Sequence, residues 1–243
     1  MSKNNKKYTY KIIFSYDGSR FCGSAKQPNM NCVQNMLDEA LKTVGIFTPS
    51  IFASRTDKGV HAKCNVAKIE SNYKLNEKFV IKKLNYVLNG IFIKNLIICE
   101  FEPRFDAKIR SYRYIISPKI NAFNKAFLCH YEKNINLNLL KEAIKIYEGE
   151  HNFKEFCLSL DKDKNTIRTI HKTRIYTYKN MIIFNFFANG FLRGQIRLMM
   201  DFLLKINEGK LNLNDLKEQI SGIKSHSRTL ASPNGLYLKS ISY

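Results

Sequence analysis

The most unusual stretch of the chain reads S-R-T-D-K-G-V-H-A and covers residues 54–62. A short apolar segment, Ile51 to Ala53, precedes it and predicts a strand that leads into a loop. In this loop Asp57 lies between basic residues, which favour its ionised form, and Gly59 can adopt the positive φ of a sharp turn. An ionised, positioned carboxylate can act as a nucleophile or can stabilise a cationic transition state. The alternative for Asp57 is structural, because most loop aspartates form turns or cap helices.

Hydrophobic patterns on both sides of this stretch predict a mixed succession of strands and helices. Residues 8–16 alternate strictly, so we expect one buried and one exposed strand face. Asn31 is expected to cap the first helix and Gly45 to end it. The predicted strands cover residues 8–16, 51–53, 65–70, 96–101, 110–116, 167–178, 181–188 and 235–241, and the predicted helices cover 33–44, 76–88, 136–147, 191–206 and 214–221. This mixture indicates α/β or α+β layers, and a boundary near residue 105 divides the chain into subdomains 1–105 and 106–243.

The charge of the chain indicates a polyanionic partner. Its 243 residues include 40 Lys or Arg and 20 Asp or Glu, which gives a formal net charge of +20. A field of this sign attracts nucleic acid first and an anionic membrane surface second. A lysine-rich coding bias is the alternative explanation. No apolar run approaches the roughly 20 residues of a membrane helix, so we expect no membrane partner.

Several cofactors and signals are not expected from the sequence. The six cysteines form no C-x-x-C pair and the five histidines show no zinc-binding spacing, so we expect reduced intracellular thiols and no metal. His61 in particular is expected to be a neutral structural imidazole. The absence of a Walker loop and of G-x-G-x-x-G predicts no nucleotide or other small-molecule cofactor. Met1 to Lys7 is polar and basic without a following apolar segment, which predicts no signal peptide.

Two further stretches concentrate the few arginines of the chain. Residues 110–114 read R-S-Y-R-Y, and arginine interleaved with tyrosine suits nucleic acid, because cations meet phosphates and a ring stacks on a base. An aromatic face of a sheet core explains the same pattern equally well. Farther along the chain, Arg193 and Arg197 are four residues apart near the start of a predicted helix, which favours anions. An ion pair between Arg197 and Asp201 is the alternative there.

Together with these stretches, motifs along almost the whole chain resemble one known family, the tRNA pseudouridine synthase A group. They are Y-D-G-x-x-F-x-G at 16–23, Q-P-N at 27–29, V-Q at 33–34, R-T-D at 55–57 with G-V-H-A at 59–62, R-F-x-A at 104–107, Y-R-Y at 112–114, F-L-R at 191–193 with Arg197, R-T at 228–229 and G-L-Y-L at 235–238. The chain departs from the family pattern at Ser24-Ala25-Lys26, where W-Q-R is usual, at Lys58, and at Gly194-Gln195. These departures concern RNA contacts and site preference more than the reaction.

The resemblance implies a fold and an activity. The fold is the α+β pseudouridine synthase fold, in which two α/β subdomains with antiparallel or mixed sheets, backed by helices, surround a basic cleft. The activity is that of an isomerase that converts uridine to pseudouridine in the anticodon stem-loop of tRNA, at positions 38–40, without a cofactor. The resemblance also implies a cytoplasmic homodimer with the tRNA lying across both subunits.

The resemblance further implies roles for single residues. Asp57 is the catalytic nucleophile, Arg55 pairs with it, and Tyr112 stacks on the target uracil and can help to remove the C5 proton. The remaining implied contacts are the apolar Leu236 and four RNA-binding cations, Arg20, Lys26, Arg193 and Arg197.

Two other classes of protein were weighed against this one. A non-catalytic basic RNA-binding protein is disfavoured by the intact Arg55, Asp57 and Tyr112. A cationic membrane-surface protein is disfavoured because the sequence shows no basic amphipathic helix with a wide apolar face.

Overall fold

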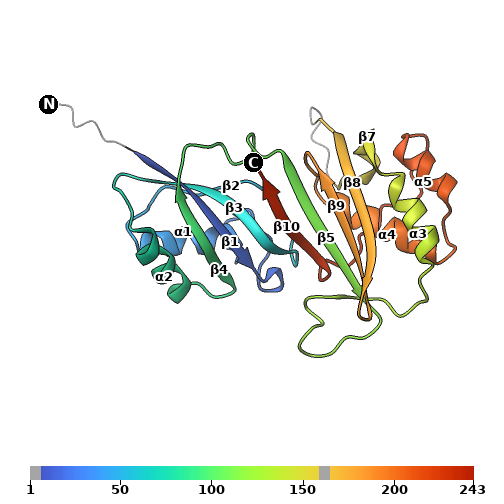
Figure 1. Cartoon of the computed structure of the whole chain (residues 1–243), viewed down its shortest axis with the longest axis horizontal. Helices are drawn as coiled ribbons and strands as arrows, with labels where there is room; N and C mark the ends of the chain where they lie inside the picture. The colour runs from blue at the N-terminus through green and yellow to red at the C-terminus, as the bar shows by residue number, and fades with distance from the viewer. Residues whose placement is uncertain (1–6, 159–164) are drawn as a thin grey trace. The chain divides into compact units, whose positions relative to one another are not determined.

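A computed structural model of the chain describes residues 7–158 and 165–243 (Figure 1). Two compact units divide the chain: Met1–Lys108 with Leu238–Tyr243, and Ile109–Tyr237. The predicted absence of a signal peptide falls mostly on residues 1–6, which lie outside the described part. Within the described part, no helix has both the length and the apolarity that a membrane crossing requires. The mixture of strands and helices confirms the expected α+β class.

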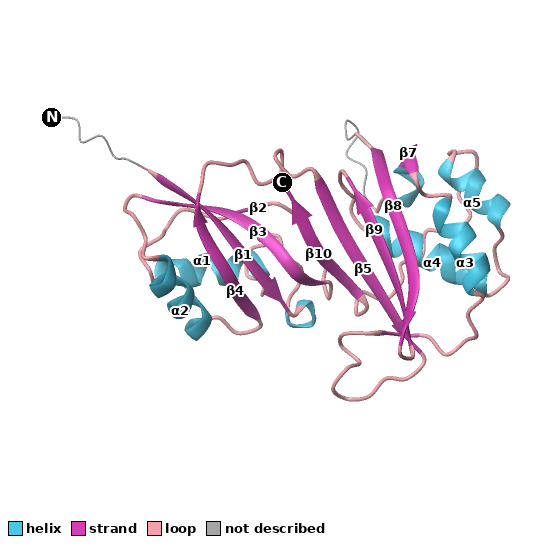
Figure 2. Cartoon of the chain, in the orientation of Figure 1, coloured by secondary structure: helices cyan, strands magenta, loops and turns pink. Residues whose placement is uncertain are grey.

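The first unit is an antiparallel sheet with two helices beside it (Figure 2). The strands are β1 (Tyr8–Tyr16), β2 (Ile51–Phe52), β3 (His61–Ser71) and β4 (Ile91–Ile98), and the helices are α1 (Val33–Lys42), α2 (Glu77–Val87) and the short 3-10 helix η1 (Gly18–Arg20). Strand β1 lies between β4 and β3 and pairs with both, and β2 pairs with β3. The last strand, β10 (Leu236–Ser242), is next to β3 in the strand order, and its residues from Leu238 onward belong to this unit.

The alternation of β1 forms the core of the first unit. Tyr10, Ile12 and Phe14 are completely buried, whereas Lys11 and Ser15 between them keep partial exposure. Burial of large side chains at every second position is the main stabilisation of such a strand, at about 25 cal/mol per Å² of apolar surface. The predicted buried face is confirmed, whereas the opposite face is only partly exposed and Thr9 on it is buried.

The start of α1 differs from the prediction. Cys32 occupies the N-cap position and makes no capping hydrogen bond with its side chain. Asn31, the predicted cap, instead donates from Nδ2 to the backbone oxygen of Arg20 at 2.8 Å, so it ties down the preceding loop. The predicted end is confirmed, because Gly45 follows the helix with φ of +76°.

The second unit combines mainly antiparallel strands with three α-helices and a short 3-10 helix. The strands are β5 (Ile109–Ser117), β6 (Cys129–His130), β7 (Gly149–Asn152), β8 (Ile167–Tyr178) and β9 (Met181–Ala188), and the helices are α3 (Leu137–Lys145), α4 (Gln195–Asn207), α5 (Leu213–Ile220) and the 3-10 helix η2 (Phe153–Phe156). Strand β9 pairs antiparallel with β5 and β8, β7 pairs with β8, and β6 runs parallel to β5. Figure 1 shows α3, α4 and α5 gathered on one side of these strands.

Three predicted boundaries are wrong. Strand β3 begins at His61, not near residue 65, and β4 covers Ile91–Ile98, not 96–101. Helix α4 begins at Gln195, not at Phe191, because Gly194 adopts φ of +71° at its N-cap. A Cβ atom on Gly194 would lie 2.6 Å from the Leu158 side chain, so a contact distant in sequence decides where this helix starts.

Candidate active site

The R-T-D stretch forms a tight turn between β2 and β3. The Val60 N–H donates to the Asp57 backbone oxygen at 3.1 Å, and Gly59 adopts φ of +80°, the pattern of a type II turn. The predicted turn at Gly59 is therefore confirmed. Asp57 is half-buried and Arg55 is exposed, so both side chains are accessible from one loop.

Hydrogen bonds of Thr56 fix this loop to the neighbouring part of the first unit. It is buried, its N–H donates to Ser24 Oγ at 2.7 Å, and its backbone oxygen accepts from the Ser24 N–H at 3.0 Å. Its own Oγ1 lies 2.9 Å from the Tyr16 hydroxyl. Because the middle residue of R-T-D is held on three atoms, the positions of Arg55 and Asp57 on either side of it are constrained.

Two glycines explain the Y-D-G-x-x-F-x-G motif. A Cβ atom on Gly18 would lie 2.0 Å from the Val60 backbone oxygen, and one on Gly23 would lie 3.2 Å from the Thr56 backbone oxygen. Any side chain on Gly18 would collide with backbone, and Gly23 also has φ of +105°. The motif therefore lets one loop lie directly against the R-T-D turn.

His61 has a structural position at the end of this turn. It is 2% exposed, and its Nδ1 accepts from the Gly18 N–H at 3.0 Å. A ring nitrogen that accepts a hydrogen bond carries no proton, so this contact describes a neutral imidazole protonated on Nε2. Because a neutral His61 carries no charge, the Asp17 carboxylate 3.4 Å from its Nδ1 does not form an ion pair with it.

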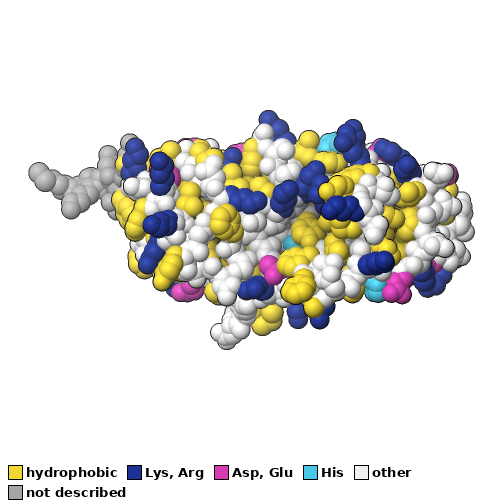
Figure 3. Space-filling model, turned by 60° about the horizontal axis from the view of Figure 1, so that its bottom comes forward, with side chains coloured by type: hydrophobic (Ala, Val, Ile, Leu, Met, Phe, Trp, Pro, Cys, Tyr) yellow, Lys and Arg dark blue, Asp and Glu magenta, His cyan; other side chains and the backbone are white. Residues whose placement is uncertain are grey.

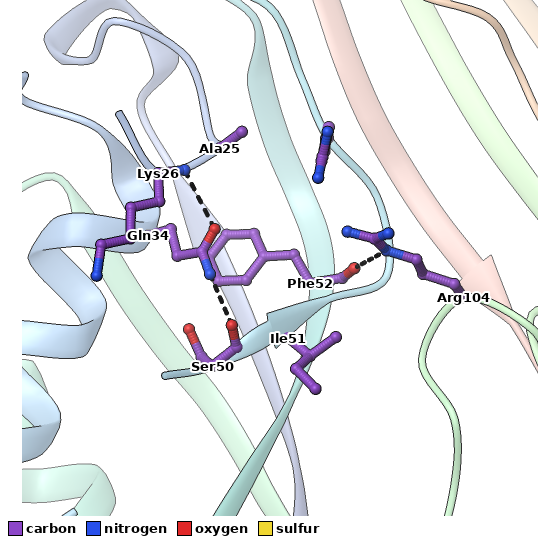
Figure 4. A pocket seen from close by; sticks show the side chains of 8 residues that line it. Ala25, Lys26, Gln34, Ser50, Ile51, Phe52 and Arg104 are labelled. Carbon is purple, nitrogen blue, oxygen red and sulfur yellow. Dashed lines mark hydrogen bonds between the residues drawn. The ribbon is translucent and has the colours of Figure 1, made fainter. Parts of the chain in front are cut away.

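A basic pocket of about 350 Å³ adjoins the turn (Figure 4). Lys26, Arg55 and Arg104 are its cations, and Ala25, Gln34, Ser50, Ile51 and Phe52 complete the lining. The Arg104 Nε donates to the Phe52 backbone oxygen at 3.4 Å, and the Lys26 N–H donates to Gln34 Oε1 at 3.2 Å. None of these eight residues is acidic, so the pocket suits an anion such as a phosphate.

The pocket brings together two predicted residues and one that the sequence prediction missed. Lys26 and Arg55 were candidates, whereas Arg104 belongs to the R-F-x-A motif but had no assigned role. One sequence feature could have indicated a role for Arg104: the chain has few arginines, and most of them lie in the motifs. The nearby Asp38 accepts from the Ser50 N–H at 3.0 Å, and burial raises the pKa of this carboxyl while the charge of Lys26 opposes the shift.

Arg20 lies in the same unit but outside this pocket. Its Nε is 3.3 Å from Asp17 Oδ2, and its Nη1 donates to Asn89 Oδ1 at 2.6 Å. These contacts hold the guanidinium at η1 while leaving it exposed at the surface. Arg20 therefore remains a candidate contact, but the structure does not place it in the lining around Arg55.

In the second unit, the Y-R-Y motif places two tyrosines on one face of β5. Tyr112 is 6% exposed and meets the edge of Phe191 with ring centroids 5.2 Å apart. Tyr114 is fully buried, its hydroxyl donates to the Ser232 backbone oxygen at 2.8 Å, and burial raises the pKa of its phenol well above the usual value. Tyr114 is thus a sheet-core residue, the alternative considered for this motif.

Arg193 and Arg197 do not share a helical face, contrary to the prediction. Arg193 precedes α4 and is exposed, and its backbone oxygen accepts from the Leu158 N–H at 3.0 Å. Arg197 lies in the first turn of α4, and its Nε donates to the Ala231 backbone oxygen at 2.7 Å. Asp201, the predicted alternative partner of Arg197, forms an ion pair with Lys205 at 2.8 Å.

Leu236 starts β10 in a closely packed segment. It is 4% exposed, and its N–H donates to the Pro233 backbone oxygen at 2.9 Å. A Cβ atom on the preceding Gly235 would lie 2.4 Å from the Ile115 backbone oxygen, so this position requires glycine.

One cluster in the described residues has the composition of a metal site. Potential ligand atoms of Asp215, Glu218 and His226 lie within 4.8 Å of one another. However, Glu218 Oε2 is 2.8 Å from His226 Nε2, whereas Asp215 Oδ1 is 3.5 Å from Nδ1. The carboxylates face different ring nitrogens, which describes a histidine held between two carboxylates and not a set of ligands converging on one point.

The family model and the similar sequences carry the same family name. The family described as tRNA pseudouridine synthase matches residues 143–243. The chain is 46% identical to the tRNA pseudouridine synthase A of Campylobacter jejuni over 96% of its own length and 99% of the relative. It is 40% identical to that of Helicobacter hepaticus over 97% of its length and 99% of the relative. A crystal structure of a Cbf5-Nop10-Gar1 complex matches 95% of the chain and 47% of the solved chain, with a TM-score of 0.37 and 9% identity.

Proposed function

The chain belongs to the tRNA pseudouridine synthase A family, whose members are isomerases that convert uridine in tRNA to pseudouridine, and from this premise we propose that it modifies the anticodon stem-loop with Asp57 as the catalytic carboxylate. The observation that carries the proposal is the R-T-D turn. Its middle residue is buried and hydrogen-bonded, and Arg55, two residues before Asp57, lines the basic pocket.

Asp57 would act as the nucleophile of a redox-neutral isomerisation. The C1′–N1 bond of uridine breaks, the base rotates, and C1′ bonds to C5 while the C5 proton leaves and N1 gains a proton. A half-buried carboxylate held on a fixed turn can stay near the sugar through these steps. The isomerisation therefore needs no oxidant, reductant or energy donor.

The basic pocket would hold the RNA backbone during the reaction. An enzyme that acts on a stacked base must first expose it, which costs a few kcal/mol. Phosphate contacts from Lys26, Arg55 and Arg104 would offset this cost. Arg55 is also adjacent in sequence to the hydrogen-bonded Thr56. It can therefore bind the phosphate and pair with the Asp57 carboxylate.

Residues of the second unit would complete the substrate contacts. Tyr112 would stack on the uracil and help to remove the C5 proton, and its edge contact with Phe191 fixes the ring plane. Leu236 would contribute apolar packing. The exposed Arg193 and Arg20 and the helix-bound Arg197 would contact RNA, consistent with the wide spread of basic side chains on the face shown in Figure 3.

We further propose that the enzyme is a cytoplasmic homodimer that binds tRNA across both subunits. The support is its membership of this family and the formal charge of +20, which favours one polyanion bound over an extended surface. Sedimentation with and without tRNA measures the number of subunits per RNA. A complex whose mass corresponds to one subunit with one tRNA would contradict the dimer.

The modified positions can be tested directly. The purified protein is incubated with unmodified tRNA transcripts, and pseudouridines are mapped by chemical labelling and primer extension. We expect new pseudouridines in the anticodon stem-loop, at positions 38–40, and none in a transcript whose uridines there are replaced by cytidine. Pseudouridine formed only in another arm would overturn the assigned position while leaving the reaction intact.

A further inference from the structure

An exposed aromatic side chain stands on the loop that connects β5 to β6. Phe123 is 92% exposed, although a phenylalanine of a monomeric globular protein normally buries most of its surface. The apolar Ile120 and Phe127 near it are also partly exposed. In Figure 1 the connection that leaves β5 extends beyond the strands of the second unit. A ring presented in this way is available to a partner.

The loop is held in one conformation by two asparagines. Asn121 Oδ1 accepts from the Phe123 N–H at 2.9 Å and from the Asn124 N–H at 3.2 Å, and Asn124 Oδ1 accepts from the Asn121 N–H at 2.7 Å. These reciprocal bonds form an Asx-type turn with Phe123 inside it. The backbone that carries the ring is therefore preorganised, which lowers the entropy lost when the loop binds.

The same loop is fastened to the segment that carries Leu236. Asn234 Nδ2 donates to the Lys125 backbone oxygen at 3.0 Å, and the Tyr237 hydroxyl donates to the Phe127 backbone oxygen. These two donors are the residues at positions two before and one after Leu236. The loop that carries Phe123 and the segment that carries Leu236 are therefore connected by hydrogen bonds, and one RNA can contact both.

We propose that Phe123 is a stacking platform for an unpaired base of the RNA substrate, an inference that rests on the proposed function. Lys119 and Lys125, both exposed, flank the ring within the loop and can neutralise phosphates beside the stacked base. An aromatic face accepts any base, since every base has a π-face. A base is favoured over a second copy of the chain as the occupant, because the two lysines beside the ring attract RNA phosphates and would repel the same lysines of another copy.

The test compares four variants on two RNAs. Phe123→Ala removes the ring, Phe123→Leu keeps an apolar side chain without a π-face, and Phe123→Tyr keeps the ring. Phe47→Ala is the matched control, since Phe47 is 75% exposed on the first unit. The RNAs are an unmodified anticodon stem-loop and a blunt duplex of the same length, which has no unpaired base. Affinity is measured by fluorescence anisotropy and turnover by pseudouridine formation.

We expect Phe123→Ala and Phe123→Leu to weaken stem-loop binding about 5- to 150-fold, the typical cost of a lost base–aromatic stack, and to leave duplex binding unchanged. Phe123→Tyr and Phe47→Ala should bind both RNAs like the wild type. Because the loss of a stack that forms before the chemical step raises KM more than it lowers kcat, the saturated rate should be nearly unchanged.

Three results would overturn the proposal. They are wild-type stem-loop affinity in Phe123→Ala, full rescue by leucine, and a change of subunit number in Phe123→Ala, which would assign the ring to contact with a second chain. If the wild type binds the stem-loop but forms no pseudouridine in it, the proposed function fails while the binding comparison still decides the role of Phe123.

Discussion

Ser24 and Thr56 form a reciprocal pair of hydrogen bonds across two loops of the first unit. The Thr56 N–H donates to Ser24 Oγ at 2.7 Å, and the Ser24 N–H donates to the Thr56 backbone oxygen at 3.0 Å. Ser24 is completely buried, so water cannot replace either bond. A residue at which the chain departs from its family pattern therefore positions the residue next to Asp57.

Ser24→Ala should destabilise the protein and lower its activity together. The substitution leaves the buried Thr56 N–H without its acceptor, at a typical cost of about 1–3 kcal/mol. Thermal unfolding and single-turnover pseudouridine formation measure the two effects. Ser221→Ala, at an exposed position, is the control and should change stability by less than about 0.5 kcal/mol. An active and fully stable Ser24→Ala protein would show that this pair does not hold the turn.

Gly23→Ala should reduce activity because the added Cβ atom would crowd the R-T-D turn. The new Cβ would lie 3.2 Å from the Thr56 backbone oxygen, so the turn must move by a few tenths of an ångström. Misplacement of a catalytic group can cost up to about 100-fold in rate. Gly222→Ala is the control, because Gly222 also has a positive φ, +73°, but nothing within 4 Å of the added atom. Equal losses in both variants would attribute the effect to backbone strain alone.

The fold was predictable where a pattern lies within one element. The alternation of Tyr10, Ile12 and Phe14 is local, and so is the glycine that lets the Asp57 turn form. The start of α4 was not predictable, because Gly194 meets Leu158 through the tertiary fold. Phe191 and Leu192 continue the apolar periodicity of the helix, so the sequence predicted a helix that starts at Phe191, although the backbone is helical only from Gln195.

The candidate site was predictable in its motifs but not in its contacts. The family resemblance assigned roles to Arg55, Asp57 and Lys26, whereas the pocket that joins Lys26 and Arg55 to Arg104 depends on contacts between segments far apart in the sequence. Tyr112 and Tyr114 are equivalent in sequence pattern and are both buried, and the complete burial of Tyr114 with its hydrogen bond to Ser232 identifies it as a core residue.

Binding of tRNA should depend steeply on salt. A protein that neutralises several phosphates loses affinity linearly in log Kd against log salt, and each phosphate contact contributes a slope of about 0.7 to 0.9. Arg104→Ala and Lys26→Ala, which remove cations from the pocket, should each reduce the slope by about 1. Lys78→Ala, on the exposed surface of α2, should leave it unchanged. A flat plot for the wild type would mean that the excess lysine is coding bias.

Tyr112→Phe should separate stacking from proton transfer. Phenylalanine keeps the ring and its contact with Phe191, so tRNA binding should stay near the wild-type value. Loss of a hydroxyl that moves the C5 proton should slow single-turnover chemistry by about 10²- to 10⁴-fold. Tyr112→Ala should also weaken binding. Tyr114→Phe, on the same strand face, is the control and should affect stability but not the chemical step. A full rate in Tyr112→Phe would limit the residue to stacking.

Release of tritium from tRNA labelled at uridine C5 tests the role of Asp57 most directly. Asp57→Asn keeps the shape of the side chain on its turn but removes the nucleophilic carboxylate. Asp106→Asn, at an exposed carboxylate of the same unit, is the matched control and should release tritium at the wild-type rate. We predict that Asp57→Asn binds tRNA with nearly wild-type affinity and releases no tritium. Release by Asp57→Asn at the wild-type rate would contradict the assignment of this carboxylate as the nucleophile.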